Sequence, residues 1–162
     1  MSELSSSNQP ETRVLFHTSM GDLIIALRND MPITTSNFKK LVQHGTYNGT
    51  IFHRVIPGFM IQGGDPTGTG YGDPSIPEIK DEFTRTNRND RGTISMANAG
   101  PNTGSSQFFI NQVNNNFLDT KHPAFGKVIS GMDVVDKIAK VPTGPNDKPR
   151  TNVTIITASI VS

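Results

Sequence analysis

The sequence lacks cysteine, an excess of charge of one sign, and long hydrophobic runs. Without cysteine the chain cannot form disulfides, thiolate nucleophiles or cysteine-ligated metal sites, and it suits a reducing compartment, which we expect to be the cytoplasm. Fifteen Lys and Arg residues nearly balance 14 Asp and Glu residues, so no strong field would attract nucleic acid. Neither a basic leader nor an apolar run of membrane-spanning length is seen. Composition therefore predicts a soluble chain with neither nucleic-acid nor membrane partners.

Short motifs of several enzyme classes are also missing. The chain has no Gly-x-Ser-x-Gly and no His-Glu-x-x-His, which argues against serine-hydrolase and zinc-peptidase chemistry. The glycine-rich run 63–72 lacks the Lys-Ser/Thr end of a phosphate-binding loop, so we interpret it as a tight loop with positive-φ glycines rather than as a nucleotide site. Ligand spacing is absent among the four histidines, His17, His44, His53 and His122. The sequence predicts no metal and no cofactor.

Length and local composition predict one domain behind a short tail. A chain of 162 residues is the size of one ordinary domain. Residues 1–12 are polar, Ser-rich and without periodicity, so we expect a flexible tail there and a single domain over residues 13–162. The Pro- and Gly-rich stretch 143–149 lies too near the end to link two domains and is expected to be a surface loop.

Short apolar runs separated by Gly, Pro, Asn and Asp predict a mainly β fold. The runs cover residues 14–16, 23–27, 51–55, 59–61, 93–96, 108–110, 125–129 and 154–161. About eight strands suffice to close a small barrel around an interior filled by side chains. Two segments have helical spacing instead, one from Pro32 to a stop at Gly45 and one over about 132–140, ended by Pro142. We predict a closed eight-stranded barrel with two α-helices capping its ends.

Residues 52–65 form the most informative stretch, because they combine two strand-like runs with a Pro-Gly turn. Alternation along a strand places three side chains on the outward face, those of Arg54, Met60 and Gln62. His53 falls on the opposite face, where we prefer a hydrogen-bonded interior histidine over a catalytic one. Taken alone, Arg54 would be interpreted as a solvated surface charge.

Three long blocks in a fixed order change that interpretation. They read FHRVIPGFMIQGGDPTGTG over 52–70, GTISMANAGPNTGSSQFFI over 92–110 and FLDTKHPAFGKVISGMDVV over 117–135. In these blocks the chain closely resembles the cyclophilin family of peptidyl-prolyl cis-trans isomerases, and the similarity extends from about residue 13 to the C-terminus. The resemblance implies a closed antiparallel barrel of eight strands with two helices. It also implies cofactor-free isomerisation of X-Pro bonds that assists protein folding.

The resemblance also implies which residues form the site. The family's catalytic arginine falls on Arg54. The apolar pocket for the proline ring falls on Phe59, Met60, Phe109, Leu118 and His122. The groove that hydrogen-bonds the substrate backbone falls on Gln62, Ala97, Asn98, Ala99 and Gln107. From the residues alone, simple core packing would have been preferred for the apolar members of the pocket.

Two positions depart from the family pattern. Phe117 stands at the groove edge where many members have tryptophan, and Gly104-Ser105-Ser106 stands where Asn-Gly-Ser is usual. Phe117 lacks an indole N–H, so we expect cyclosporin A to bind, but more weakly than to a tryptophan-bearing relative. The expected partners are proline-containing peptides and flexible protein segments, bound by a monomer.

Two alternatives to an enzyme stay open at this point. In one, the chain is a proline-directed binding module or holdase whose isomerisation is incidental. In the other, it is an inert barrel with structural interactions only. Arg54 favours the enzyme, because a binding module has no need of a charged donor beside the proline pocket.

Overall fold

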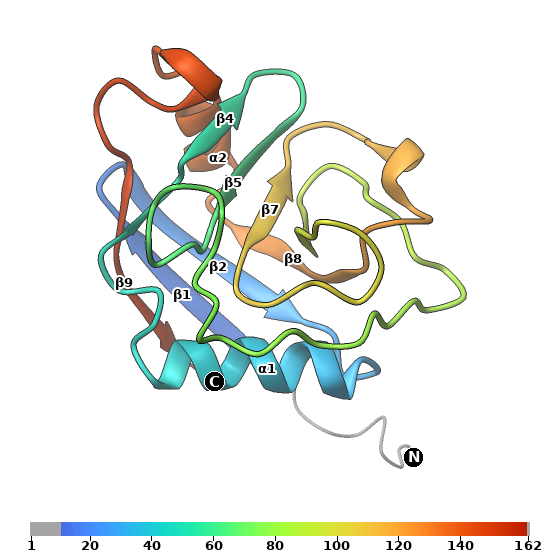
Figure 1. Cartoon of the computed structure of the whole chain (residues 1–162). Coiled ribbons are helices and arrows are strands. Elements are labelled where there is room, and N and C mark those ends of the chain that lie inside the picture. The colour runs from blue at the N-terminus through green and yellow to red at the C-terminus, as the bar shows by residue number, and fades with distance from the viewer. Residues whose placement is uncertain (1–10, 162) are drawn as a thin grey trace.

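One curled antiparallel sheet of nine strands dominates the structure, a computed structural model that describes residues 11–161 (Figure 1). The strands are β1 (Arg13–Thr18), β2 (Gly21–Leu27), β3 (Thr50–Ile51), β4 (Arg54–Ile56), β5 (Met60–Gly63), β6 (Thr93–Met96), β7 (Phe108–Asn111), β8 (Ala124–Ser130) and β9 (Thr154–Ile160). The helices are α1 (Pro32–Gln43) and α2 (Met132–Ala139), with short 3-10 turns η2 (Asn116–Leu118) and η3 (Pro145–Asp147). The predicted mainly β fold with two helices is confirmed. Neither helix is long and apolar enough to cross a membrane, as far as residues 11–161 are concerned.

The order of strands in the sheet is β3-β9-β1-β2-β8-β6-β7-β5-β4, and every pairing is antiparallel. Its two edge strands, β3 and β4, are consecutive in the sequence and are separated only by Phe52 and His53. The run predicted as one strand over 51–55 is therefore two strands, which raises the number from eight to nine. Strand pairing does not join β3 to β4, so by its hydrogen bonds the sheet is a half-barrel, and the closed eight-stranded barrel that we predicted is not confirmed.

The split of this run has a local cause. Phe52 donates its N–H to the Val153 carbonyl at 2.9 Å, which still follows the edge of the sheet beside β9. Phe52 and His53 are then both buried, although adjacent residues of one regular strand would point to opposite faces. The chain thus leaves one edge of the sheet and enters the other within two residues.

Aromatic rings fill the interior of the curled sheet. Phe38 from α1 lies 5.0 Å from Phe125 and 5.2 Å from Tyr47, measured between ring centroids. Phe16 of β1 and Phe108 of β7 lie 5.5 Å apart in the same cluster. Each buried ring removes a large apolar surface from water, so this cluster supplies much of the drive for folding.

Helix α1 covers one end of the curled sheet, and α2 lies by the opposite end near β4 (Figure 1). Pro32 occupies the first turn of α1, as its spacing predicted, and the backbone turns at Gly45, where φ is 74°. Glu82 satisfies the open N-terminus of α1 from outside the helix. Its carboxylate accepts the N–H groups of Ile33 and Thr34 at 3.0 and 2.6 Å.

Candidate active-site groove

Arg54 and Gln62 face each other across the β4–β5 hairpin, and Gln62 in turn faces Phe109 of β7. Residues directly opposite one another in neighbouring strands share a face of the sheet. The exposed Arg54 guanidinium donates from Nη1 to Gln62 Oε1 at 3.4 Å. The hairpin turns at Gly58, whose φ of 74° suits glycine. The predicted outward patch on β4 and β5 therefore continues onto β7.

Met60 and Phe109 form the floor of this outward face. They are only 2% and 4% exposed, yet neither belongs to the main core cluster inside the sheet. Met60 thus does lie outside the core, as predicted, but it is covered rather than open to solvent. Two buried apolar side chains thus lie on the face that carries the exposed arginine, where the predicted pocket for the proline ring would have its base.

His122 forms one wall of the pocket. Its ring meets the Phe109 ring edge to face, with centroids 5.2 Å apart and planes at 84°. Its Nδ1 lies 2.9 Å from the Met96 carbonyl, and since a carbonyl only accepts, Nδ1 carries the proton and donates it. Asn98 donates from Nδ2 to the Lys121 carbonyl at 2.9 Å, so the two segments on this side are tied together.

Phe59 and Leu118 lie at the other wall. The Phe59 carbonyl accepts the Gln112 N–H at 3.0 Å and the Asn115 Nδ2 at 2.9 Å, which fixes the end of the turn before β5. Leu118, on η2, is half-buried, and its carbonyl accepts the His122 N–H at 3.0 Å. The five residues predicted for the proline pocket therefore come from the turn before β5, from β5 and β7, and from the 116–122 segment, and the hydrogen bonds of these segments hold them in place.

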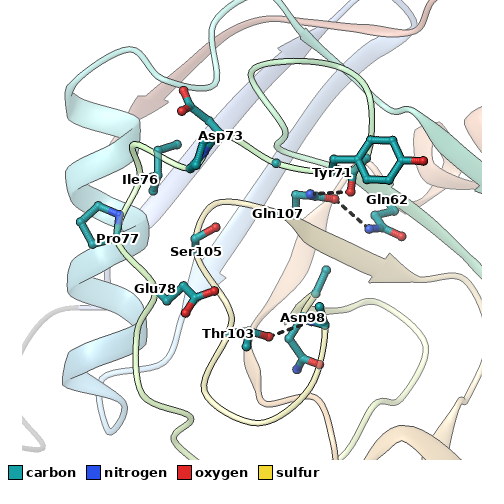
Figure 2. Close-up of a pocket in the computed structure, with 15 residues that line it drawn as sticks. Gln62, Tyr71, Asp73, Ile76, Pro77, Glu78, Asn98, Thr103, Ser105 and Gln107 are labelled. Carbon is teal, nitrogen blue, oxygen red and sulfur yellow. Dashed lines mark hydrogen bonds between the residues drawn. The ribbon is translucent and has the colours of Figure 1, made fainter.

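A cavity of about 780 Å³ adjoins this pocket (Figure 2). Five of its lining residues are the predicted groove residues Gln62, Ala97, Asn98, Ala99 and Gln107. Gln62 donates from Nε2 to Gln107 Oε1 at 3.0 Å, and Gln107 donates from Nε2 to the Gly70 carbonyl at 3.1 Å. Figure 2 shows Gln107 between Gln62 and the loop before Tyr71.

The part of the cavity lining that comes from the segment 70–78 was missed by sequence reasoning. It includes Tyr71, which is 96% exposed, together with Asp73 and Glu78. The segment carrying them has no apolar periodicity, and it is fixed by a distant pairing in which Ile79 donates its N–H to the Gly104 carbonyl at 2.8 Å. Asp73 accepts hydrogen bonds from the Ser75 hydroxyl and N–H, which lower the pKa of its carboxyl.

His53 lies next to Gly70, and the prediction that it is a hydrogen-bonded interior histidine is only partly right. It is an interior residue, as expected, but its Nδ1 has no hydrogen-bond partner among residues 11–161. Burial lowers the pKa of His53, against the attraction of Asp65 and with the help of Arg54 and Lys148. The ring is therefore neutral near pH 7 and does not add a second cation beside Arg54.

The glycine-rich run 63–72 is a tight loop, as predicted. Gly64, Gly68, Gly70 and Gly72 have positive φ angles between 70° and 91°. Within the described residues 11–161, no three His, Asp or Glu side chains gather to hold a metal ion.

Comparison with known proteins adds an independent line of support. The family model described as "Cyclophilin type peptidyl-prolyl cis-trans isomerase/CLD" matches residues 13–160. Peptidyl-prolyl cis-trans isomerase-like 1 of Gibberella zeae is 46% identical over 154 residues, which cover 93% of this chain and 95% of that protein.

Some similar proteins are much longer. Peptidyl-prolyl cis-trans isomerase CYP71 of Arabidopsis thaliana is 48% identical over 96% of this chain, but the match covers 25% of that protein. Peptidylprolyl isomerase domain and WD repeat-containing protein 1 of Mus musculus is 52% identical over 90% of this chain and 23% of its own length. The chain thus spans about a quarter of the length of these relatives.

Solved structures show the same fold. A cyclophilin-type peptidyl-prolyl cis-trans isomerase of Cryptosporidium parvum superposes with a TM-score of 0.90 at 37% identity, over 94% of this chain and 99% of that one. A second structure of that protein, described as in the presence of the dipeptide Ala-Pro, gives 0.88 at 38% identity, over 93% and 99% of the two chains. The chain therefore belongs to the family of cyclophilin-type peptidyl-prolyl cis-trans isomerases.

Proposed function

We propose that the chain catalyses cis-trans isomerisation of X-Pro peptide bonds, with Arg54 as the catalytic residue. The observation that carries the proposal is that an exposed guanidinium and a buried apolar floor share one face of the sheet. Arg54 and Phe109 stand on either side of Gln62 in the cross-strand register. The floor, with Phe59, Leu118 and His122 around it, suits a pyrrolidine ring in size and polarity.

The chemistry follows from the electronic structure of the peptide bond. Rotation meets a barrier of about 18–20 kcal/mol because the nitrogen lone pair is delocalised into the carbonyl. As the bond twists, the prolyl nitrogen becomes pyramidal and its lone pair can accept a hydrogen bond. A donor from Arg54 at that nitrogen is therefore matched to the twisted transition state and not to the planar ground state.

The remaining groove residues hold the two sides of the bond. The apolar pocket keeps the proline ring still, while Gln62 and the backbone at Asn98 bind the residue before it, so that only the bond between them rotates. Arg54 presents a rigid planar array of donors. The reaction needs no nucleophile, metal or proton transfer, and we propose that no cofactor takes part.

The experiment is two-dimensional exchange NMR on a short Ala-Pro peptide. Wild type is expected to accelerate exchange in chelator as well as without it, whereas Arg54→Ala is expected to lose most of this acceleration. Arg85→Ala, which removes another exposed arginine outside the groove, is the matched control. A module that only binds proline segments would leave exchange at the uncatalysed rate, and activity lost in chelator but restored by a metal would contradict the proposal.

The cavity beside Gln107 extends this proposal to the substrate residues that precede the X-Pro pair. Its lining includes two carboxylates, Asp73 and Glu78, and no Lys or Arg. Tyr71 adds an exposed ring to the rim, and aromatic rings attract cations over their faces. We propose that the cavity favours substrates with a Lys or Arg side chain at that point.

Five further properties complete the proposal. Assistance to protein folding follows from the activity, because X-Pro isomerisation is slow enough to limit folding rates. Cyclosporin A is proposed as a ligand of the groove, weakened by Phe117. The monomeric state and the cytoplasmic location stay predictions. The closed barrel is supported by the two-residue link between β3 and β4, through which the chain itself connects the two edges of the sheet.

A further inference from the structure

Asp65 is the only Asp or Glu side chain that is buried among residues 11–161, with 0% of its surface exposed. A buried carboxylate is costly unless several donors compensate for the lost water. Here Oδ1 accepts the Thr67 N–H at 2.9 Å and its hydroxyl at 2.8 Å. Oδ2 accepts the N–H groups of Gly70 and Gly72 at 2.8 and 3.0 Å. Burial alone would raise the pKa of Asp65, but these hydrogen bonds outweigh it and lower the pKa.

These hydrogen bonds hold the loop 66–72 around one carboxylate and so fix the direction of its outward carbonyl groups. The Gly70 carbonyl accepts the hydrogen bond from Gln107 Nε2. Gly70 therefore contacts both groups, since its N–H donates to the Asp65 carboxylate and its carbonyl accepts from Gln107. Gly64, just before Asp65, packs closely against the segment before Gln107, because a Cβ added there would come within 2.6 Å of the Ser106 carbonyl oxygen.

Three hydrogen bonds connect the Gly70 carbonyl to Arg54 through Gln107 and Gln62. The groups at the two ends, a carbonyl and a guanidinium, determine which atom donates in each bond. The Gly70 carbonyl can only accept, so Gln107 must present its NH₂ to it and its oxygen to Gln62. Gln62 must then present its NH₂ to Gln107 and its oxygen to Arg54, which can only donate. Turning either amide by 180° would place like groups together at two contacts.

We propose that Asp65 is a positioning residue of the isomerase site. By fixing the Gly70 carbonyl it sets the orientation of the Gln107 and Gln62 amides, and through them the place of the Arg54 guanidinium. The inference rests on the proposed function, because it gives Arg54 the catalytic part. It matters because the contact with Gln62, at 3.4 Å, is the one hydrogen bond that the side chain of the exposed Arg54 makes among residues 11–161, so the Gln62 amide is the group that can orient the donor. Displacement of a catalytic group by about 1 Å can cost on the order of 100-fold in rate.

The test is a double-mutant cycle with Asp65→Asn and Gln107→Ala, read as kcat/KM on a proline peptide. Asparagine keeps the shape of the side chain but turns an NH₂ toward either Thr67 or the two glycine N–H groups. Asp65→Asn is expected to lower kcat/KM by about tenfold, mainly through kcat. In the Gln107→Ala background the same change is expected to have little effect, because the contact that transmits it is gone.

Glu82→Gln is the matched control, since Glu82 also accepts backbone N–H groups but caps α1 away from the groove. It is expected to lower thermal stability without lowering kcat. A loss for Asp65→Asn of the same size in both backgrounds, or a kcat loss no greater than that of Glu82→Gln, would overturn the proposal and leave Asp65 a structural residue.

Two measurements keep the proposal testable if Asp65→Asn folds poorly or if wild type proves inactive. Thr67→Ala removes one hydrogen bond from the carboxylate at an exposed position and is expected to give a smaller loss in the same direction. The side-chain NH₂ resonances of Gln62 and Gln107 report amide orientation without turnover. They are expected to shift in Asp65→Asn and Thr67→Ala but not in Glu82→Gln, and unchanged resonances would refute the relay whatever the activity of the protein.

Discussion

Phe59, which we propose as part of the proline pocket, stacks on Phe117, with ring centroids 6.0 Å apart and planes inclined by 23°. Phe59 is half-buried, whereas Phe117 is 71% exposed. The exposed ring therefore extends the apolar wall of the pocket toward solvent. Phe117 offers a bound ligand a ring face but no hydrogen-bond donor.

We predict that Phe117→Trp strengthens cyclosporin A binding. The indole adds an N–H donor at the rim while keeping a ring against Phe59. One hydrogen bond contributes about 0.5–1.5 kcal/mol, which corresponds to a roughly two- to tenfold lower dissociation constant. Calorimetric titration of wild type, Phe117→Trp and Phe117→Tyr measures the effect, and Tyr controls for ring size. Equal affinities for wild type and the Trp variant would contradict the prediction.

A second prediction concerns pH and His53. Burial lowers the pKa of His53 below its ordinary value of 6.5, so the unfolded chain binds this proton more readily than the folded one. The neutral His53 ring therefore makes its full contribution to the free energy of unfolding above about pH 6.5, and this contribution is lost as the pH falls below that value. Denaturant unfolding from pH 5 to 8 is expected to show this decline, and His53→Gln, which cannot titrate, is expected to flatten it. An identical pH dependence in the two proteins would show that His53 does not contribute.

Much of the fold could be predicted from local pattern, because most strands and both helices are bounded by turn residues close to them in the sequence. Pro32 and Gly45, for example, mark the limits of α1 without reference to the rest of the chain. The split between β3 and β4 could not be predicted, because Phe52 follows the edge of the sheet through the distant Val153 carbonyl. The cap of α1 by Glu82 was missed for the same reason, since the two partners lie 48 and 49 residues apart.

In the candidate site too, some residues could be predicted from local sequence, whereas others depend on distant contacts. The residues proposed for the pocket lie in blocks that could be matched to a family, and the structure brings them together on one face. Tyr71, Asp73 and Glu78 belong to a segment without periodicity, whose position depends on the pairing of Ile79 with Gly104. Asp65 lies inside a matched block, but the role that we propose for it depends on its burial and on the hydrogen bonds to its carboxylate, which residue spacing does not reveal.

The charge of the cavity gives a third prediction. A peptide with Lys before the X-Pro pair is expected to show about two- to fivefold higher kcat/KM than one with Glu, since exposed charges attract only weakly. The preference is expected to shrink at 0.5 M salt and to disappear in the double variant Asp73→Asn/Glu78→Gln. Hydrogen bonds from Ser75 lower the pKa of Asp73, so its carboxylate stays charged at neutral pH. If the double variant still preferred Lys over Glu to the same extent, the preference would have to come from residues other than Asp73 and Glu78.

The last prediction tests the mechanism through Arg54→Lys. Lysine keeps the charge and most of the aliphatic stem but loses the planar array of donors. If Arg54 acts through a directed hydrogen bond to the pyramidal prolyl nitrogen, kcat/KM is expected to fall by one to three decades, which corresponds to about 1.4–4 kcal/mol of transition-state stabilisation. Peptide affinity is expected to fall no more than a few-fold, because the apolar pocket and backbone contacts hold the ground state. Stability is expected to change little at this exposed position.

Exchange NMR, peptide titration and thermal unfolding on one preparation separate the explanations of such a loss. Arg85→Lys, the same change at an exposed position outside the groove, is expected to leave all three measurements unchanged. Near-native turnover in Arg54→Lys would mean that charge without direction is sufficient, since lysine keeps the charge but loses the planar array of donors. Equal losses of affinity and turnover would instead make Arg54 a binding residue. In that case the proline-binding module would explain the groove better than the enzyme, because nothing in the site would then favour the twisted bond over the planar one.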